Sequence, residues 1–205
     1  MRRVIAYIDG FNLYFGLRAK GWRRYYWIDV HRLAERLLRP DQTLAGVRYF
    51  TARVSGSRDP GEPKRQATYL EALETLRGVT IHYGHYLVKP RRCRACGTRW
   101  DSHEEKMTDV NLAVALLEDA YDDRFDTALI VSADSDLLAP IKAVRRRFEA
   151  KRVVVAFPPA RSSAALRDVA HASFTIGRAV LRESQLPETV VKADGYLLRR
   201  PTNWT

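Results

Sequence analysis

Residues 4–12 read VIAYIDGFN, a short apolar run that ends in a carboxylate, a glycine and an amide. Residues 127–136 read TALIVSADSD and repeat this arrangement, with two aspartates after the apolar run. A third run, RVVVAF at 152–157, is followed by two prolines. Short apolar runs rich in β-branched residues are typical of strands that are buried on both faces. We therefore predict that the three runs are inner strands of a parallel sheet.

Helical patterns lie between the strand-like runs. Asp29 has the character of an N-cap for a helix that ends near Leu38, and further helices are predicted over 66–76, 104–120, 135–148 and 162–169. Further strands are predicted over 47–54, 79–88 and 173–176. Helices that alternate with strands indicate right-handed crossovers within one sheet. We predict a single α/β domain over residues 1–180, with three layers (α/β/α) and a mostly parallel central sheet. It carries a cysteine-containing basic insertion at about 89–103, and a tail over 181–205 packs on the domain.

Charge and length narrow the classes of function. The chain has 205 residues, and its 46% hydrophobic and 29% charged residues exclude wholesale disorder. The net charge of +11 favours a polyanionic partner such as nucleic acid or an anionic membrane surface, although a generally basic proteome would give the same surplus. No apolar run approaches 18 residues, and Asp9 interrupts the apolar start early. We therefore expect no membrane span, no signal peptide and a cytoplasmic protein.

Acidic and polar residues follow two of the predicted strands. Asp9 and Asn12 come after the first, and Asp134 and Asp136 come after the run that ends at Ser132. Open parallel sheets bind their ligands beyond the carboxyl ends of their strands. The hydroxyls of Ser132 and Ser135 could orient these carboxylates. The alternative is that Asp134 serves only as an N-cap of the next helix.

Asp109 supplies a further acidic position on the helix expected over 104–120. Glu105 precedes it by four residues, so the two would share a helix face, and a solvated acidic first turn is the alternative. Crowded carboxylates repel one another unless a cation lies between them. Mg²⁺ or Mn²⁺ would suit such oxygen ligands, and could activate water and stabilise charge on a phosphate. An acidic site on a basic chain is the combination expected of a nuclease.

Three motifs carry a resemblance to a known family: DGFN at 9–12, KMTDV at 106–110 and SADSD at 132–136. Over residues 3–180 the chain resembles the NYN domain, a PIN-like nuclease family, and is most similar to its LabA-like branch. The resemblance implies a PIN-like fold and a metal-dependent endoribonuclease that uses Mg²⁺ or Mn²⁺ on RNA. It implies metal-binding acids at Asp9, Asp109, Asp134 and Asp136. It also implies that Asn12 orients the site and that Glu105 assists. An RNA-binding or regulatory module is the alternative.

Cys93 and Cys96 have a spacing that is used by metal and redox sites. With His103 and either His85 or His82 they could complete a tetrahedral zinc site. Reduced thiols in a basic loop and a redox disulfide stay open as alternatives.

Basic and aromatic residues interleave in two segments. One is expected to bind nucleic acid through Arg91, Arg92, Arg94, Arg99, Trp100 and Lys106. The other covers 23–27, RRYYW. Solvated loops whose aromatic rings pack inward are the alternative for both segments. The expected partner is single-stranded or structured RNA, and a homodimer or a regulatory protein partner stays open. We expect Trp204, in the tail, to dock on the domain.

Overall fold

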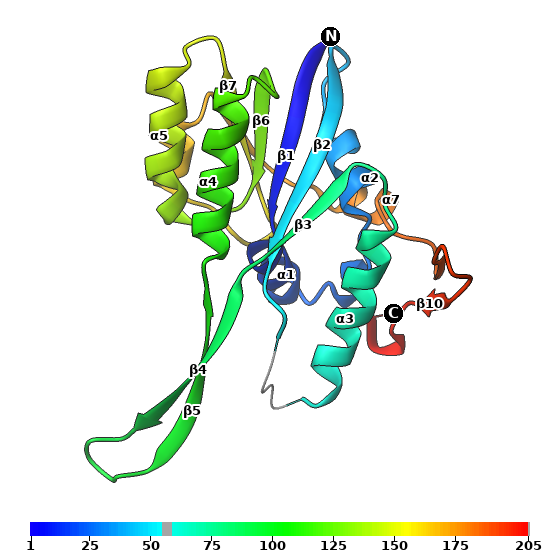
Figure 1. The fold of residues 1–205 in the computed structure, drawn as a ribbon, viewed down its shortest axis with the longest axis vertical. Helices are drawn as coiled ribbons and strands as arrows, with labels where there is room; N and C mark the ends of the chain where they lie inside the picture. The colour runs from blue at the N-terminus through cyan, green and yellow to red at the C-terminus, as the bar shows by residue number, and fades with distance from the viewer. Residues whose placement is uncertain (55–58, 205) are drawn as a thin grey trace.

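The computed structural model describes residues 1–54 and 59–204, with the side chains of all of these except 86–89 and 100–105. Its centre is a six-stranded sheet in the order β3-β2-β1-β6-β7-β8, and every pairing in it is parallel (Figure 1). The strands are β1 (Arg2–Asp9), β2 (Gln42–Thr51), β3 (Val79–Tyr83), β6 (Thr127–Val131), β7 (Arg152–Phe157) and β8 (Ala172–Thr175). The α/β class and the parallel sheet are confirmed.

Helices cover both faces of this sheet and make three layers. One layer holds α1 (Gly10–Ala19), α2 (Val30–Arg36), α3 (Gly61–Glu74) and α7 (Arg178–Glu183); the other holds α4 (Thr108–Tyr121), α5 (Leu138–Arg147) and α6 (Ala164–Val169). Along β1, Val4, Ala6 and Ile8 belong to the first core, whereas Ile5 and Tyr7 belong to the second. This period of two is why β1 is apolar at every position of its inner part.

Short polar turns set the ends of several helices. Asp29 caps α2 as expected, because its carboxylate accepts the N–H of Arg32 at 2.8 Å. A 3₁₀ turn, η1 (Arg23–Tyr25), leads toward this cap, and it is followed by Tyr26 and the fully buried Trp27. The aromatic rings of 25–27 therefore belong to the core, and the hypothesis of a nucleic-acid platform at 23–27 is wrong.

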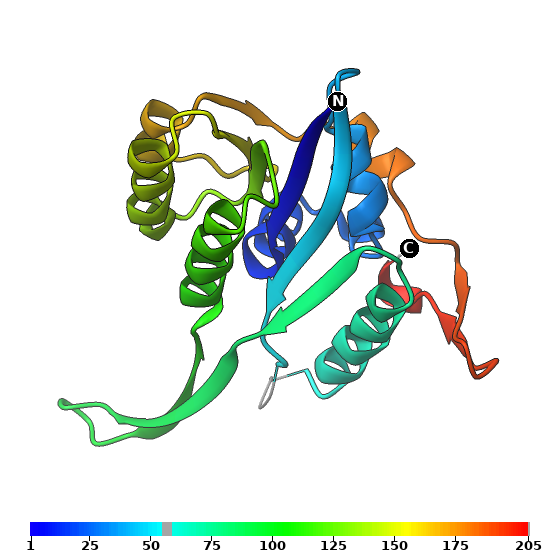
Figure 2. The same cartoon turned by 45° about the horizontal axis from the view of Figure 1, so that its top comes forward.

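A two-stranded antiparallel hairpin stands where a basic loop was expected. Its strands are β4 (His85–Arg92) and β5 (Arg99–Lys106), and we call residues 85–106 the arm. The arm extends away from the body of the molecule in both views (Figures 1 and 2). Residues 85–88 lie within the strand predicted over 79–88, whereas 89–92 and 99–106 are mostly charged or polar and gave no strand pattern. Cross-strand hydrogen bonds hold these two strands together.

The helix predicted from Glu104 begins only at Thr108, so Glu104 and Glu105 lie in β5. Met107 separates strand from helix with a left-handed backbone, at φ 75°. Gly84 separates β3 from β4: a Cβ there would lie 2.6 Å from the carbonyl oxygen of Lys106. This close approach explains why one continuous strand over 79–88 was wrong.

The last residues lie against the layer of α1 to α3. They form the short hairpin of β9 (Thr189–Val191) and β10 (Leu197–Arg199) and the turn η3 (Thr202–Trp204). The indole N–H of Trp27 donates to the carbonyl of Pro187 at 2.7 Å, and the Trp204 ring lies 6.0 Å from that of Tyr69 and 6.3 Å from that of Trp27. Among the helices described, none has the length and apolar character needed to cross a membrane.

Candidate functional site

The strand order changes direction beside β1. From β1 the chain crosses to β2 and β3 on one side, and later elements add β6, β7 and β8 on the other. The helices that follow β1 and β6 therefore pack on opposite faces of the sheet. The carboxyl ends of these two strands form the switch point at which open parallel sheets bind ligands, and we call this place the crevice. Ile8 pairs with Val131, so Asp9 and Ser132 emerge side by side at this point.

Ser132 joins the two loops that leave these strands. Its hydroxyl donates to Asp9 Oδ2 at 2.9 Å and accepts the backbone N–H of Asp134 at 3.0 Å. Asn12 makes a second link, because its amide oxygen accepts the N–H of Ala133 at 3.1 Å. Ser132 is fully buried and Asp9 is 4% exposed. Hydrogen bonds among buried groups hold both loops in one arrangement.

The aspartates also serve as helix caps. Asp9 Oδ1 accepts the N–H of Asn12 at 2.9 Å at the start of α1. Asp134 accepts the N–H of Asp136 at 3.0 Å at the start of the 3₁₀ turn η2 (Ser135–Leu137). Asp134 can therefore cap the turn and also bind a ligand such as a metal ion, because a carboxylate oxygen has a second lone pair. Asp134 is half-buried and Asp136 is exposed.

Asp109 reaches the same edge of the sheet from the first turn of α4. This helix contacts β1, β3 and η2, and Asn111 donates from its amide to the carbonyl of Tyr83 at 3.2 Å. Asp109 is half-buried. Glu105 does not share a helix face with it, because Glu105 belongs to β5, and the Glu105 side chain lies outside the described part of the structure.

The acids form no ready-made metal cage. Across the described side chains, no three or more carboxylate, histidine or cysteine groups are gathered closely enough to hold an ion. The donors at the crevice nevertheless suit a hard cation, because Asp9 and Asp134 present oxygen atoms held in place by Ser132. Of the predicted acids, the structure links Asp9, Asp134 and Asp136 by hydrogen bonds and brings the helix of Asp109 to their edge.

Sequence reasoning missed two residues that shape this crevice. A Cβ on Gly10 would lie 2.5 Å from the Tyr49 hydroxyl, so only glycine lets α1 begin against β2. Burial raises the pKa of Tyr49, and the negative charge of Asp9 adds to this effect. The signal for the close approach was Gly10 itself, placed directly after a strand.

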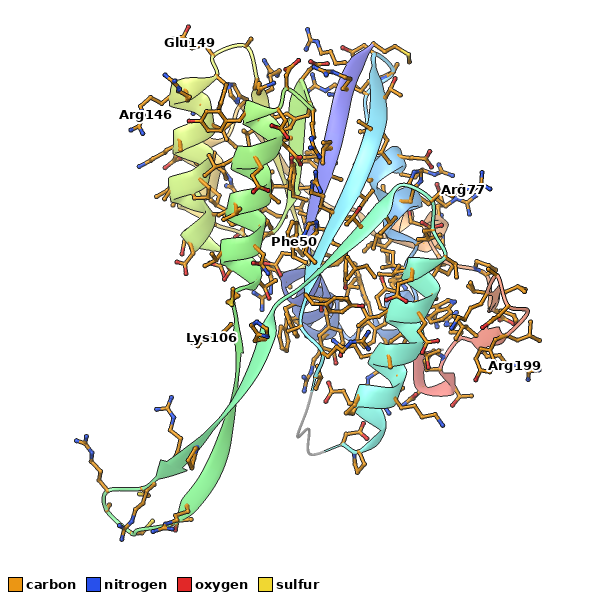
Figure 3. All side chains as sticks on the ribbon, in the orientation of Figure 1. Phe50, Arg77, Lys106, Arg146, Glu149 and Arg199 are labelled. Atoms are coloured by element: carbon orange, nitrogen blue, oxygen red, sulfur yellow. The ribbon has the colours of Figure 1, made fainter. Side chains whose placement is uncertain are left out.

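The predicted nucleic-acid residues lie along the arm. Arg92 pairs with Arg99 at its far end, and Arg91, Arg94 and Lys106 are exposed as well. Lys106 lies where the arm joins α4, near the carboxyl edge of the sheet, in Figure 3. The side chain of Trp100 is outside the described residues. Among the described side chains, positive charge therefore lies at the base of the arm, at Lys106, and around its tip, at the four arginines.

The structure does not gather the four residues expected to bind zinc. Cys93 and Cys96 lie at the tip of the arm, whereas His85 pairs with Lys106 at its base. Seven residues of strand separate His85 from the last pair, a span of about 23 Å. The backbone of His103 pairs with that of Val88, and its side chain is not among those described. His82 stacks on Phe50 in the body, with ring centroids 4.8 Å apart.

A doubly wound parallel sheet with acids at its switch point defines the class: a PIN-like α/β domain. The NYN domain matches residues 3–177, and the chain belongs to this family, which lies within the PIN-like nuclease superfamily. A curated relative is 6-hydroxy-3-succinoylpyridine 3-monooxygenase HspA of Pseudomonas putida, 29% identical over 188 residues. The match covers 75% of this chain and 59% of HspA, so the chain spans less than two thirds of that relative.

The fold is also similar to a solved structure. A protein of unknown function from Vibrio parahaemolyticus, VPA0982, superposes with a TM-score of 0.55 and 20% sequence identity. The similarity covers 90% of this chain and 96% of the other. At this identity the comparison establishes the shared fold alone.

Proposed function

We propose that this chain is a metal-dependent endoribonuclease that hydrolyses RNA phosphodiester bonds at the carboxyl ends of β1 and β6. One observation carries the proposal: Ser132 holds the carboxylate of Asp9 and the backbone of Asp134 together at the switch point of the sheet. Membership of a PIN-like nuclease superfamily supports it.

The proposed ligands are the carboxylates of Asp9, Asp109, Asp134 and Asp136. When bound there, Mg²⁺ or Mn²⁺ would provide Lewis-acid stabilisation of the phosphate under attack and lower the pKa of a water molecule. Crowded carboxylates repel one another unless a cation lies between them, so a bound cation would stabilise a closer arrangement of these groups. Asp136 is exposed and so has room to turn toward Asp134.

The remaining residues would position the substrate. Asn12 links α1 to the loop after β6 through Ala133, which keeps the acids in register across the crevice. The arginines of the arm and Lys106 would bind phosphates on either side of the cleaved bond, and the net charge of +11 would draw RNA toward the acidic edge.

The same site also favours a second candidate, an RNA-binding or regulatory module. The observation in its favour is that no described group of three ligands is preformed. In that case the arm would bind RNA and the acids would serve as helix caps. The monooxygenase activity in the name of HspA belongs to that relative. Whether this chain has such an activity would need an assay of its own.

An end-labelled single-stranded RNA would distinguish these functions. We expect cleavage with Mn²⁺ and none with EDTA, and we expect Asp134→Asn to lower the rate by at least about a hundredfold, because several kcal/mol of charge stabilisation is lost. Glu149→Gln is the matched control, since Glu149 is exposed at the opposite end of the molecule (Figure 3). Metal-independent binding without cleavage would favour the binding module. If Asp134→Asn cleaved RNA as fast as the unmodified chain, Asp134 would have no role in the mechanism.

A further inference from the structure

The tip of the arm is a tight turn that presents two thiols. The N–H of Cys93 donates to the carbonyl of Thr98 at 2.8 Å, and the N–H of Gly97 donates to the carbonyl of Cys93 at 3.0 Å. Gly97 has a left-handed backbone, at φ 75°, which lets the chain reverse directly after Cys96. Neither cysteine is in a disulfide; Cys93 is half-buried and Cys96 is exposed. Two cysteines separated by two residues are the usual half of a structural zinc site.

The turn also favours the thiolate form that a metal requires. The Cys96 sulfur lies 3.1 Å from the Thr98 hydroxyl. The hydroxyl is placed to donate a hydrogen bond to this sulfur, which favours the negatively charged form. Four exposed arginines surround the turn at positions 91, 92, 94 and 99. Their positive charge stabilises negative sulfur in the same way.

One chain supplies only two ligands at this place. A structural zinc site takes four, and the chain contains no other cysteine. His85 is about 23 Å away along β4, and the backbone of His103 is four residues, or about 13 Å, from the Arg92–Arg99 pair. Of the other histidines, His31 lies in α2, His82 in β3 and His171 between α6 and β8, so all three belong to the body. In the described part of the chain no group of three ligands occurs.

The shape of the molecule leaves this half-site accessible to a second copy. The tip is the part of the arm farthest from the sheet in both views, so another tip can approach it while the two bodies stay apart (Figures 1 and 2). Two arginine-rich tips would repel each other if nothing lay between them. One Zn²⁺ with four thiolates carries a net charge of −2, which would offset this repulsion.

We propose that the arms of two copies of this chain meet at their tips and share one Zn²⁺, bound by Cys93 and Cys96 of each copy. The site is incomplete in a single chain, so zinc binding and dimer formation are one event. The proposal is independent of the nuclease assignment, because it uses neither the acids of the crevice nor RNA.

Metal content and mass, measured together on the full chain purified under reducing conditions, test this proposal. We expect about one zinc per two chains and the mass of a dimer. Treatment with 1,10-phenanthroline should give the monomer, whereas the non-thiol reductant tris(2-carboxyethyl)phosphine should leave the dimer intact. Replacement of zinc by Co²⁺ should give the absorption spectrum of a tetrathiolate site. Three results would each overturn the proposal. They are one zinc per monomer, no bound zinc after Zn²⁺ is supplied, and a dimer that survives removal of the metal.

Variants of the turn provide a second test of the proposal. Cys93→Ser and Cys96→Ser should each lower the zinc content at least tenfold and give monomers. Ala95→Ser is the matched control, because it adds a hydroxyl to the same exposed turn without removing a thiol; it should keep both zinc and dimer. A dimer of the unmodified chain that tris(2-carboxyethyl)phosphine dissociates, and that 1,10-phenanthroline does not, would assign the cysteines to a disulfide between chains, which contradicts shared zinc.

Discussion

Ser132 donates its hydroxyl hydrogen to Asp9 across the boundary between β6 and β1, at 2.9 Å. The two residues are 123 positions apart in the chain and both are buried. The same hydroxyl accepts the N–H of Asp134, so one side chain sets the relative position of two of the proposed ligands. Positioning groups of this kind typically change metal affinity or activity by a factor of about 10–100.

Ser132→Ala should therefore lower RNA cleavage about 10–100-fold and raise the Mn²⁺ concentration needed for half-maximal activity. It should also lower the free energy of unfolding by about 1–3 kcal/mol, because a buried carboxylate loses a hydrogen bond. Rates across a Mn²⁺ titration and urea unfolding would measure both effects. Ser163→Ala is the control. The Ser163 hydroxyl caps α6 by accepting the N–H of Leu166 at 3.3 Å, so its loss should affect stability alone. Equal cleavage by both variants would contradict the role of Ser132.

Removal of charge from the arm should weaken RNA binding and its salt dependence. The RNA association constant should fall as the salt concentration rises. In the double variant Arg92→Ala/Arg94→Ala, the plot of its logarithm against log salt should be less steep by about 0.7 for each phosphate that the protein no longer neutralises. The control is Arg146→Ala/Arg147→Ala, which removes the same charge from the exposed last turn of α5, far from the arm (Figure 3). Fluorescence anisotropy of a labelled RNA at several salt concentrations would measure the slopes. Identical slopes for the two double variants would show that RNA does not bind to the arm.

Asp119 is buried in an ion pair on the face of the sheet covered by α4. It is 1% exposed, accepts the Tyr7 hydroxyl at 2.7 Å and forms a two-bond ion pair with Arg48. Asp119→Ala leaves the arginine without its partner and should lower the free energy of unfolding by about 3–5 kcal/mol. Asp122→Ala, which breaks the exposed pair with Arg124, should cost less than about 1 kcal/mol. Urea unfolding would measure both, and similar losses would contradict a buried, unsolvated pair.

Buried tyrosines should make the protein sensitive to alkali. Burial raises the pKa of Tyr7, and so does the hydrogen bond to Asp119; burial also raises the pKa values of Tyr49 and Tyr69. A raised pKa in the folded state gives stability that is present below the unfolded pKa of about 10 and is lost as pH rises above it.

The free energy of unfolding should then fall above about pH 10, and Tyr7→Phe should reduce its slope by up to about 1.4 kcal/mol per pH unit. Urea unfolding between pH 8 and 11.5 would measure this slope. Tyr196→Phe is the control, because Tyr196 is 62% exposed. An unchanged slope in Tyr7→Phe would mean that Tyr7 ionises equally in both states.

Local patterns were sufficient for the central strands and several caps. The runs at 4–8 and 127–131 are buried on both faces, and the run at 152–157 is buried on one face and half-buried at the start of the other. Such strands are apolar at successive positions. Asp29 acts as the predicted cap because capping depends on residues within one turn of the helix. The position of the polar residues after β1 and β6 could be predicted as well, because residues that directly follow parallel strands lie at the carboxyl edge of the sheet.

The arm could not be inferred in the same way. Residues 89–92 and 99–106 are mostly charged or polar, so no periodicity of two predicted that the strand expected over 79–88 would continue into a hairpin. The turn into α4 depends on the left-handed Met107 and the close approach of Gly84. The resulting register decided that His85 and Cys93 lie at opposite ends of the arm. Spacing along the chain could not reveal this separation, because it does not show where a strand reverses.

The sequence by itself determined the α/β class, the inner strands and the polar residues that follow two of them, because burial and capping act over a few neighbouring residues. Only the tertiary structure decided which of these residues lie side by side. Pairing of β1 with β6 placed Ser132 against Asp9, while the crossing of β3 toward the arm brought α4 with Asp109 to the same edge. These relationships join residues more than a hundred positions or several elements apart, and they follow from strand order and register, which no local pattern encodes.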